Sequence, residues 1–251
     1  MAYIDLRGHQ TWSNEFANNG EALLSLHGGL SASHRWDYLI LPAVADNYHV
    51  YSYDRTAHGR TGIRPGYYHF EFQANEAIAY IEDVIKGPTH MIGHSDGAII
   101  SLMVAIKRPD LVKSIVSIGA NFNWDAGFAP NEFDGEIMIS EEDAAEYAEL
   151  SPDAPENQQS IIKRAREIWK SEPTMTTEDL AKINCPVLVM AGEEEPFSNH
   201  HTIDLYEALA DADLAIVPGA THSVMKDKPE FALAILKDFY SGLRERDLDQ
   251  Q

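Results

Sequence analysis

The sequence is poor in cysteine and in basic residues, and it contains no long apolar run. Its single cysteine, Cys185, cannot form an intramolecular disulfide, which favours a reducing compartment. No apolar stretch is long enough to cross a bilayer, and no basic segment followed by an apolar one stands at the start. We therefore expect a cytoplasmic protein with no membrane partner.

Basic residues are outnumbered by acidic ones, with 19 Lys and Arg against 40 Asp and Glu and a formal net charge of −21. Such a field repels phosphate backbones, so we expect no nucleic-acid partner. The imbalance is greatest between Phe122 and Leu180, where 15 acidic residues accompany 4 basic ones. This segment either carries a solvated helical surface or provides a field that attracts cationic substrates.

The sequence also lacks paired cysteines, and its 11 histidines do not form a convincing ligand set. His200 and His201 are adjacent, so on a helix they point in different directions. His27, His58 and His94 belong to turn motifs or to the end of a strand, where histidines more often hold loops by hydrogen bonds. We therefore expect no metal and no cofactor.

Strand-like and helix-like segments alternate along most of the chain, and 251 residues suffice for one α/β domain. This alternation predicts a doubly wound, mostly parallel sheet that is preceded by an antiparallel hairpin. The predicted strands are 3–7, 10–14, 21–26, 48–53, 89–92, 112–119, 186–191 and 214–217. The predicted helices are 33–41, 71–86, a segment ending at 107, 141–150, 156–170, 201–210 and 228–244.

Residues 122–180 interrupt this alternation, because they contain predicted helices and prolines but no convincing strand. We predict that they form a helical cap over the carboxyl ends of the strands, where sheets of this kind bind ligands. Residues 1–121 and 181–251 would then form the core. The polar tail, 245–251, is expected to fray.

A Gly-x-Ser-x-Gly sequence, Gly93-His94-Ser95-Asp96-Gly97, joins an apolar strand to a helix. A serine at the tip of such a turn has a strained backbone that directs its hydroxyl away from the sheet. The flanking glycines allow strand and helix to approach closely, and the helix N-terminus offers free N–H groups to an oxyanion. The alternative is a glycine-rich turn in which Ser95 only caps the helix.

A serine hydroxyl needs a base to take its proton and a third group to orient that base. His222 follows Pro218-Gly219 after a late strand, at the same predicted sheet edge as Ser95, and is our candidate base. Three consecutive glutamates, 193–195, follow the preceding strand. Spacing from Gly192 and the following Pro196 favour Glu195 as the acid, and Asp125 is an outside candidate.

Together these motifs resemble the α/β-hydrolase superfamily, especially the esterase branch that includes valacyclovir hydrolase and its bacterial relatives. The matching segments, in family order, are His27-Gly28-Gly29-Leu30, Asp54-Arg55-x-x-His58-Gly59-Arg60, Gly93-His94-Ser95-Asp96-Gly97, Gly192-x-x-Glu195-Pro196-Phe197 and Pro218-Gly219-x-x-His222. The resemblance implies Ser95 as nucleophile, His222 as base and Glu195 as acid. It also implies an oxyanion hole from the backbone N–H of Asp96 and of Leu30 or Gly29.

Two departures from the family pattern concern the acid and the elbow. Glu195 stands where most relatives carry aspartate, and its longer side chain requires a displaced backbone. Asp96 is followed by one glycine rather than two. In the valacyclovir-hydrolase-like branch this Asp can meet a substrate ammonium group, but here it could equally supply only its N–H and stabilise the helix N-terminus.

Aromatic side chains from the cap and adjoining loops are predicted to form either the substrate-pocket wall or the core of the cap. They are Phe122, Trp124, Phe128, Trp169 and the Tyr67-Tyr68 pair.

The sequence thus predicts a serine hydrolase for a small carboxylic ester or lactone, present as a monomer or homodimer. Carbon–carbon bond hydrolases and cofactor-free lyases share the fold and the triad, and they remain alternatives. A ligand-sensing protein with slow or no turnover is a third. Haloalkane dehalogenases and epoxide hydrolases are disfavoured, because those relatives carry an aspartate where Ser95 stands.

Overall fold

The computed structural model describes residues 1–66 and 68–249, with side chains through residue 243. Tyr67, a predicted pocket-wall residue, lies outside the described residues. The strands are β1 (Ala2–Leu6), β2 (His9–Phe16), β3 (Glu21–Leu26), β4 (Tyr48–Tyr53), β5 (Thr89–His94), β6 (Val112–Ile118), β7 (Val187–Glu194) and β8 (Ala212–Thr221). The helices are α1 (Ser33–Val44), α2 (Phe70–Tyr80), α3 (Asp96–Lys107), α4 (Glu141–Leu150), α5 (Asn157–Trp169), α6 (Thr177–Leu180), α7 (Asn199–Ala208), α8 (Val224–Asp227) and α9 (Pro229–Asp249).

All eight of these strands form one sheet in the order β1-β2-β4-β3-β5-β6-β7-β8. β1 and β2 form the predicted antiparallel hairpin, and β2 also pairs antiparallel with β4. Every other pairing is parallel. The predicted fold class, a mostly parallel doubly wound sheet with an N-terminal hairpin, is confirmed.

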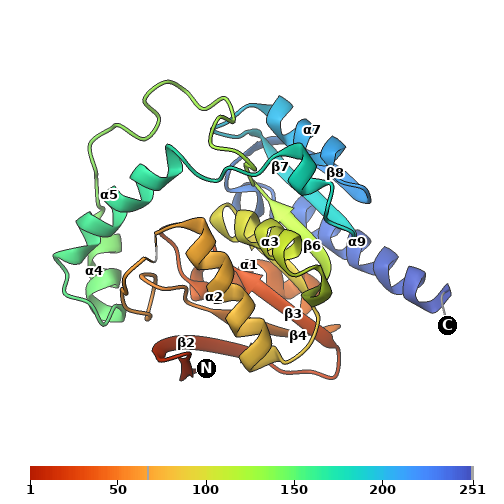
Figure 1. Cartoon of the computed structure of the whole chain (residues 1–251), viewed down its shortest axis with the longest axis horizontal. Helices are drawn as coiled ribbons and strands as arrows, with labels where there is room; N and C mark the ends of the chain where they lie inside the picture. The colour runs from red at the N-terminus through yellow and green to blue at the C-terminus, as the bar shows by residue number, and fades with distance from the viewer. Residues whose placement is uncertain (67, 250–251) are drawn as a thin grey trace.

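Helices cover both faces of the sheet, each over its own apolar core (Figure 1). Side chains of α2, α3, α6 and α7 pack on one face, and those of α1, α8 and α9 pack on the other. The central strands supply apolar side chains to both cores, which explains why β3, β5 and β6 are almost wholly buried.

Some helix boundaries differ from the prediction for local reasons. The predicted helix 71–86 is α2 followed by a π-helical turn, Ile81–Ile85, and it ends at Lys86 in the left-handed conformation. The last helix begins at Pro229 and continues through residues 245–249, where a frayed tail was expected. Residues 250–251 lie outside the described residues.

The segment between β6 and β7 leaves the sheet and carries α4 and α5 to one side of it (Figure 1). Its two ends meet, because an isolated bridge joins Asn123 to Thr174 and the Met175 N–H donates to the Phe122 carbonyl at 3.0 Å. α4 contacts the core through Arg35 of α1, which donates to two acidic side chains of α4. A separate cap between residues 122 and 180 remains a prediction.

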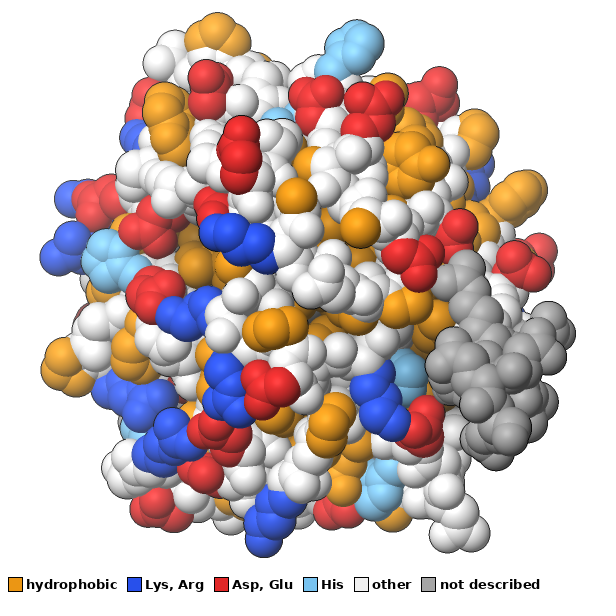
Figure 2. All heavy atoms as spheres, turned by 45° about the vertical axis from the view of Figure 1, so that its right-hand side comes forward, with side chains coloured by type: hydrophobic (Ala, Val, Ile, Leu, Met, Phe, Trp, Pro, Cys, Tyr) orange, Lys and Arg blue, Asp and Glu red, His pale blue; other side chains and the backbone are white. Residues whose placement is uncertain are grey.

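Charged side chains of both signs are interspersed on the face shown in Figure 2, and acidic ones gather toward its top. Within residues 1–66 and 68–249, no helix combines the length and the apolarity that crossing a membrane would require.

We predict that Leu24→Ala destabilises the fold by about 2–5 kcal/mol, because it opens a cavity under a central strand. Leu24 of β3 has no exposed surface and belongs to the core beneath α2 and α3. Leu214 of β8 is 37% exposed, so Leu214→Ala should cost much less. Urea unfolding of both variants measures the difference, and equal losses of stability would contradict this account of the core.

Candidate active site

Ser95 occupies the turn between β5 and α3 with a strained backbone, φ 53° and ψ −121°. The turn is tight because a Cβ at Gly93 would lie 2.3 Å from the Gly97 carbonyl carbon, and one at Gly97 would lie 2.3 Å from the Leu26 carbonyl oxygen. The Ser95 N–H donates to the Ile118 carbonyl at 2.8 Å, which ties the turn to the end of β6. These contacts describe a nucleophile elbow.

Glu195 and His222 each stand directly after a strand, as Ser95 does. β7 ends at Glu194 and β8 ends at Thr221, and both are parallel to β5 and β6. The three side chains are therefore at one edge of the sheet.

The ends of β7 and β8 approach so closely that a Cβ at Gly192 would lie 2.3 Å from the Thr221 carbonyl oxygen. This approach brings the Glu195 carboxylate to 2.5 Å from His222 Nδ1. The second carboxylate oxygen of Glu195 accepts the Gly192 N–H at 3.0 Å. The Glu195 side chain is fully buried, whereas that of His222 is 32% exposed.

The other acid candidates have different partners. Glu193 accepts the Gly219 N–H at 2.9 Å, and Glu194 is exposed. Asp125 is exposed in the loop after β6, where its N–H donates to the Asn123 side chain. Of the four carboxylates considered from the sequence, Glu195 alone makes a hydrogen bond to His222.

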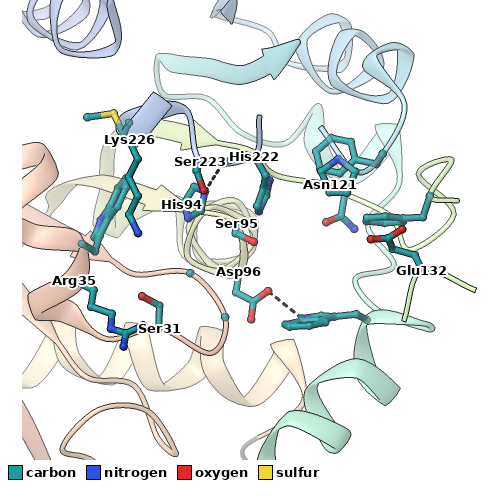
Figure 3. A pocket seen from close by; sticks show the side chains of 18 of the residues that line it. Ser31, Arg35, His94, Ser95, Asp96, Asn121, Glu132, His222, Ser223 and Lys226 are labelled. Atoms are coloured by element: carbon teal, nitrogen blue, oxygen red, sulfur yellow. Dashed lines mark hydrogen bonds between the residues drawn. The ribbon is translucent and has the colours of Figure 1, made fainter. Parts of the chain in front are cut away.

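Ser95 and His222 face a cavity of about 310 Å³ between the sheet edge and the α4–α5 segment. The His222 ring lies above the Ser95 hydroxyl in the close view of Figure 3. No hydrogen bond joins these two side chains in the structure of residues 1–66 and 68–249. Other residues that line the cavity include Gly28, Gly29, Ser31, Arg35, Trp36, His94, Asp96, Asn121, Phe128, Glu132, Phe133, Trp169, Glu172, Phe197 and Lys226.

Two backbone N–H groups near Ser95 differ in their availability to an oxyanion. Asp96 is the first residue of α3, so its N–H has no acceptor within the helix. The Leu30 N–H donates to His58 Nε2 at 3.1 Å, and Leu30 does not line the Ser95 cavity. Gly29 does line it, so the structure favours Gly29 over Leu30 as the second donor.

The Asp96 carboxylate lines the cavity but already has partners. It accepts a hydrogen bond from Trp169 Nε1 at 3.1 Å, drawn as a dashed line in Figure 3. A Cβ at Gly29 would lie 2.4 Å from its other oxygen. Burial raises the pKa of Asp96, while the positive charge of Arg55 and the Trp169 hydrogen bond lower it. Asp96 therefore joins the serine turn to α5.

Arg55 is fully buried behind the glycine loop that lines the cavity. Its guanidinium donates to the carbonyls of His27 and Gly28 at 3.1 and 2.9 Å, and also to Gln73. These bonds fix the loop whose next residue is Gly29. Burial lowers the pKa of Arg55, and the charge of Asp96 raises it.

His94, just before the serine, holds the loop that carries His222. Its Nε2 lies 2.8 Å from the His222 carbonyl oxygen, and its ring stacks on Trp36 at 5.4 Å between centroids. Burial lowers the pKa of His94 to about 4, and the neighbouring His222 adds to this effect. His94 is thus neutral near neutral pH and donates from Nε2.

Of the aromatic residues predicted for the pocket wall or the cap core, some line the cavity and others do not. Phe128 and Trp169 line the cavity, but Phe122 packs into the sheet core and stacks on His201 at 4.1 Å. Trp124 is 46% exposed and lies outside the cavity. Both residues stand where the segment between β6 and β7 leaves the sheet, and their backbones bond to residues 173 and 175 there.

Several cavity residues were not predicted from the sequence, among them Arg35, Trp36, Asn121 and Lys226. Lys226 belongs to α8, a short helix that begins two residues after His222. The sequence pattern predicted no helix between residues 210 and 228, so it gave no signal for this lysine. Within the described part of the chain, no three His, Cys, Asp or Glu side chains are grouped so that they could hold a metal ion.

The fold and the turn around Ser95 point to one protein family, and comparison of the sequence with family models confirms it. The chain belongs to the alpha/beta hydrolase family, whose model matches residues 23–235. The predicted superfamily is thereby confirmed, while the esterase branch remains a prediction.

Two characterised relatives and one solved structure illustrate the similarity. The (E)-2-((N-methylformamido)methylene)succinate hydrolase of Acinetobacter baylyi is 24% identical over 235 residues, covering 84% of this chain and 87% of the relative. The 2-(acetamidomethylene)succinate hydrolase of Mesorhizobium japonicum is 24% identical over 250 residues, covering 88% of each. The meta-cleavage product hydrolase CumD of Pseudomonas fluorescens superposes with a TM-score of 0.75 at 18% identity, covering 96% of this chain and 98% of CumD.

We predict that His58 makes the stability of the glycine loop depend on pH. Its Nδ1 donates to the Thr56 carbonyl and its Nε2 accepts the Leu30 N–H, so only the neutral ring fits. Burial, with the charge of Arg55, lowers the pKa of His58 from 6.5 to about 3. The unfolded chain therefore binds a proton that the folded chain excludes, and stability falls as pH falls through 6.5.

The His58→Gln variant retains an acceptor for Leu30 but does not titrate. On lowering the pH from neutral to about 5, it should lose about 2 kcal/mol less stability than the unsubstituted protein does. His200→Gln, at an exposed position on α7, is the matched control. Urea unfolding across this pH range gives the comparison, and parallel curves for His58→Gln and the unsubstituted protein would refute the assignment.

Proposed function

We propose that the protein is a serine hydrolase that cleaves a small carboxylic ester, or a lactone, through an acyl-enzyme. Ser95 attacks the carbonyl carbon, and His222 takes the hydroxyl proton and returns it to the leaving alcohol. Water then repeats the sequence on the acyl-enzyme, releasing the acid and regenerating Ser95. The observation that carries this proposal is the 2.5 Å contact between Glu195 and His222 at the edge where Ser95 emerges.

Glu195 would act by orienting the imidazole and stabilising its charged form. A carboxylate on Nδ1 leaves Nε2 to accept the serine proton, and a buried carboxylate favours the imidazolium that forms. The contact between His222 and the Ser95 hydroxyl would close in the substrate complex, because catalytic hydrogen bonds are often long before substrate binds.

The tetrahedral intermediate would be held by the backbone N–H groups of Asp96 and Gly29. The N-terminus of α3 adds a positive dipole end at the same place. Arg55 supports the Gly29 side of this hole, since its guanidinium binds the carbonyls of the two preceding residues. The preference for Gly29 rests on the engagement of the Leu30 N–H with His58.

A second candidate reaction is favoured by the relatives. The two enzymes named above are, by their names, hydrolases of acylaminomethylene succinates. The proposed triad and oxyanion hole would suit attack on such an acyl group as well. Two observations distinguish the other predicted alternatives. The substrates that are turned over separate carbon–carbon bond hydrolysis and lyase chemistry from ester hydrolysis, and the time course separates a ligand sensor from an enzyme.

We predict that Ser95→Ala loses about 10⁶-fold in kcat on every substrate that the unsubstituted protein hydrolyses. The measurement is a panel of esters, lactones, amides, acylaminomethylene succinates and vinylogous diketones, followed by titration of released acid. Sustained ester turnover supports the main proposal, and a single burst followed by arrest supports the sensor. Ester hydrolysis that survives in Ser95→Ala would refute the mechanism.

We predict that Glu195→Gln lowers kcat by about 10⁴-fold, because the amide preserves shape but no longer stabilises the imidazolium. Glu193→Gln is the matched control, since that carboxylate contacts the Gly219 N–H rather than His222. Steady-state kinetics of the two variants on one ester gives the comparison. A larger loss in the Glu193 variant would move the acid role away from Glu195.

A further inference from the structure

The cavity around Ser95 has different charged side chains on its two sides. In the close view, Ser31, Arg35 and Lys226 lie on one side of Ser95, while Asn121 and Glu132 lie on the other (Figure 3). The first side therefore contains both of the cationic side chains in the cavity wall. A substrate carrying charge would be oriented by this difference.

Arg35 does not supply a free charge, because its guanidinium is occupied. It donates to Glu146 through Nε and Nη2 at distances between 2.6 and 3.0 Å, and to Asp143 at 2.9 Å. Both acceptors belong to α4, so the Arg35 guanidinium is paired within the protein and holds that helix against α1. An anion in the cavity would have to compete with two carboxylates for it.

Lys226 is different, because within the described residues its ammonium makes no hydrogen bond or ion pair. The adjacent Asp227 forms no ion pair with it within those residues, and the Asp227 carboxylate instead accepts both the N–H and the hydroxyl of Thr221. The Lys226 charge lies close enough to the site to lower the pKa of His94, although this is a minor contribution there.

The position of Lys226 is set by the packing of α8. Val224 and Met225 are buried in the core shared with α1 and α9, which fixes this short helix. The Lys226 N–H donates to the Ser223 carbonyl at 2.8 Å, one residue after His222. The ammonium is thus carried at the cavity wall by the same loop that carries the histidine.

We propose that Lys226 binds a carboxylate of the substrate, so that the enzyme prefers esters with a free carboxylate a few bonds from the scissile carbonyl. The proposal rests on the proposed ester hydrolysis and names its substrate class. The carboxylate would pair with the one cation of the cavity wall that the protein leaves unpaired within its described residues. Because the lysine is exposed to solvent, the preference is moderate and weakens with salt.

The test compares kcat/KM for matched substrates that differ only in charge. In the first series the charge lies in the acyl part: monomethyl glutarate is the anion, its primary amide is the neutral counterpart, and a trimethylammonium analogue of the same length is the cation. In the second series the charge lies in the alcohol part: acetylglycolate is the anion and its primary amide is the neutral counterpart. We expect the anionic member to be preferred in at least one series, and the anion-to-amide ratio to fall about fivefold in Lys226→Gln, chiefly through KM.

Two further variants distinguish the loss of the carboxylate preference from a nonspecific effect of substitution on activity. Lys226→Glu should reverse the preference between the anionic substrate and its amide. Lys237→Gln, which removes an exposed lysine from α9 outside the cavity, should leave the ratio as it is. A ratio that is unchanged in both Lys226 variants, or a preference for the trimethylammonium ester, overturns the proposal.

A binding measurement keeps the proposal testable if the esters are not hydrolysed at all. Calorimetric titration of glutarate into Ser95→Ala and into Ser95→Ala with Lys226→Gln needs no turnover. About fivefold weaker binding in the double variant supports the carboxylate site, even where the ester proposal has failed. Equal affinities, or no binding to either variant, overturn the site.

Discussion

The close approach of β7 and β8 at Gly192 is the constraint on which the rest of the site depends. No side chain fits there, since a Cβ would meet the carbonyl oxygens of Ala220 and Thr221 at 2.4 and 2.3 Å. Because the strands converge, the residues that follow them, Glu195 and His222, come within hydrogen-bond distance. A residue larger than glycine at this point would separate the Glu195 carboxylate from the His222 ring without altering either side chain.

The backbone after β7 brings the long side chain of Glu195 to His222. The pairing of β7 with β8 shifts register between Gly192 and Glu194, so the end of β7 departs from the regular ladder. The Glu195 side chain turns back to accept the Gly192 N–H with one oxygen and reaches His222 with the other. Gly119 leaves room beside this pair, since a Cβ there would lie 3.0 Å from the His222 ring.

The fold could be predicted because its signals are local. Apolar strands and helical spacings predicted a mostly parallel, doubly wound sheet with an N-terminal hairpin, and the motif around Ser95 predicted the turn between β5 and α3. The ends of strands were harder to predict, because β7 and β8 run past their apolar residues into Glu194 and Thr221 by pairing with each other. Hydrophobicity does not record such pairing.

The cavity walls were harder still, because they depend on tertiary contacts. Phe122 looked like a ligand-binding aromatic but is held in the core by pairing where the segment between β6 and β7 leaves the sheet. The N–H of Leu30, one of the two donors predicted for the second half of an oxyanion hole, donates to His58 Nε2. Neither fact could be read from residue type, because each is decided by a partner distant in sequence.

The site is therefore made of two parts that are held with unequal strength. Ser95 and Glu195 follow β5 and β7, whose apolar residues are buried, and His222 follows β8, which pairs with β7, so displacing these residues would disturb the core. The α4 side is fastened by the partly exposed pairs of Arg35 with Asp143 and Glu146, and exposed ion pairs contribute only about 0.2–1 kcal/mol each. Arg35 itself lines the cavity, so this wall can change at little cost in stability, whereas the residues at the sheet edge are held by the core.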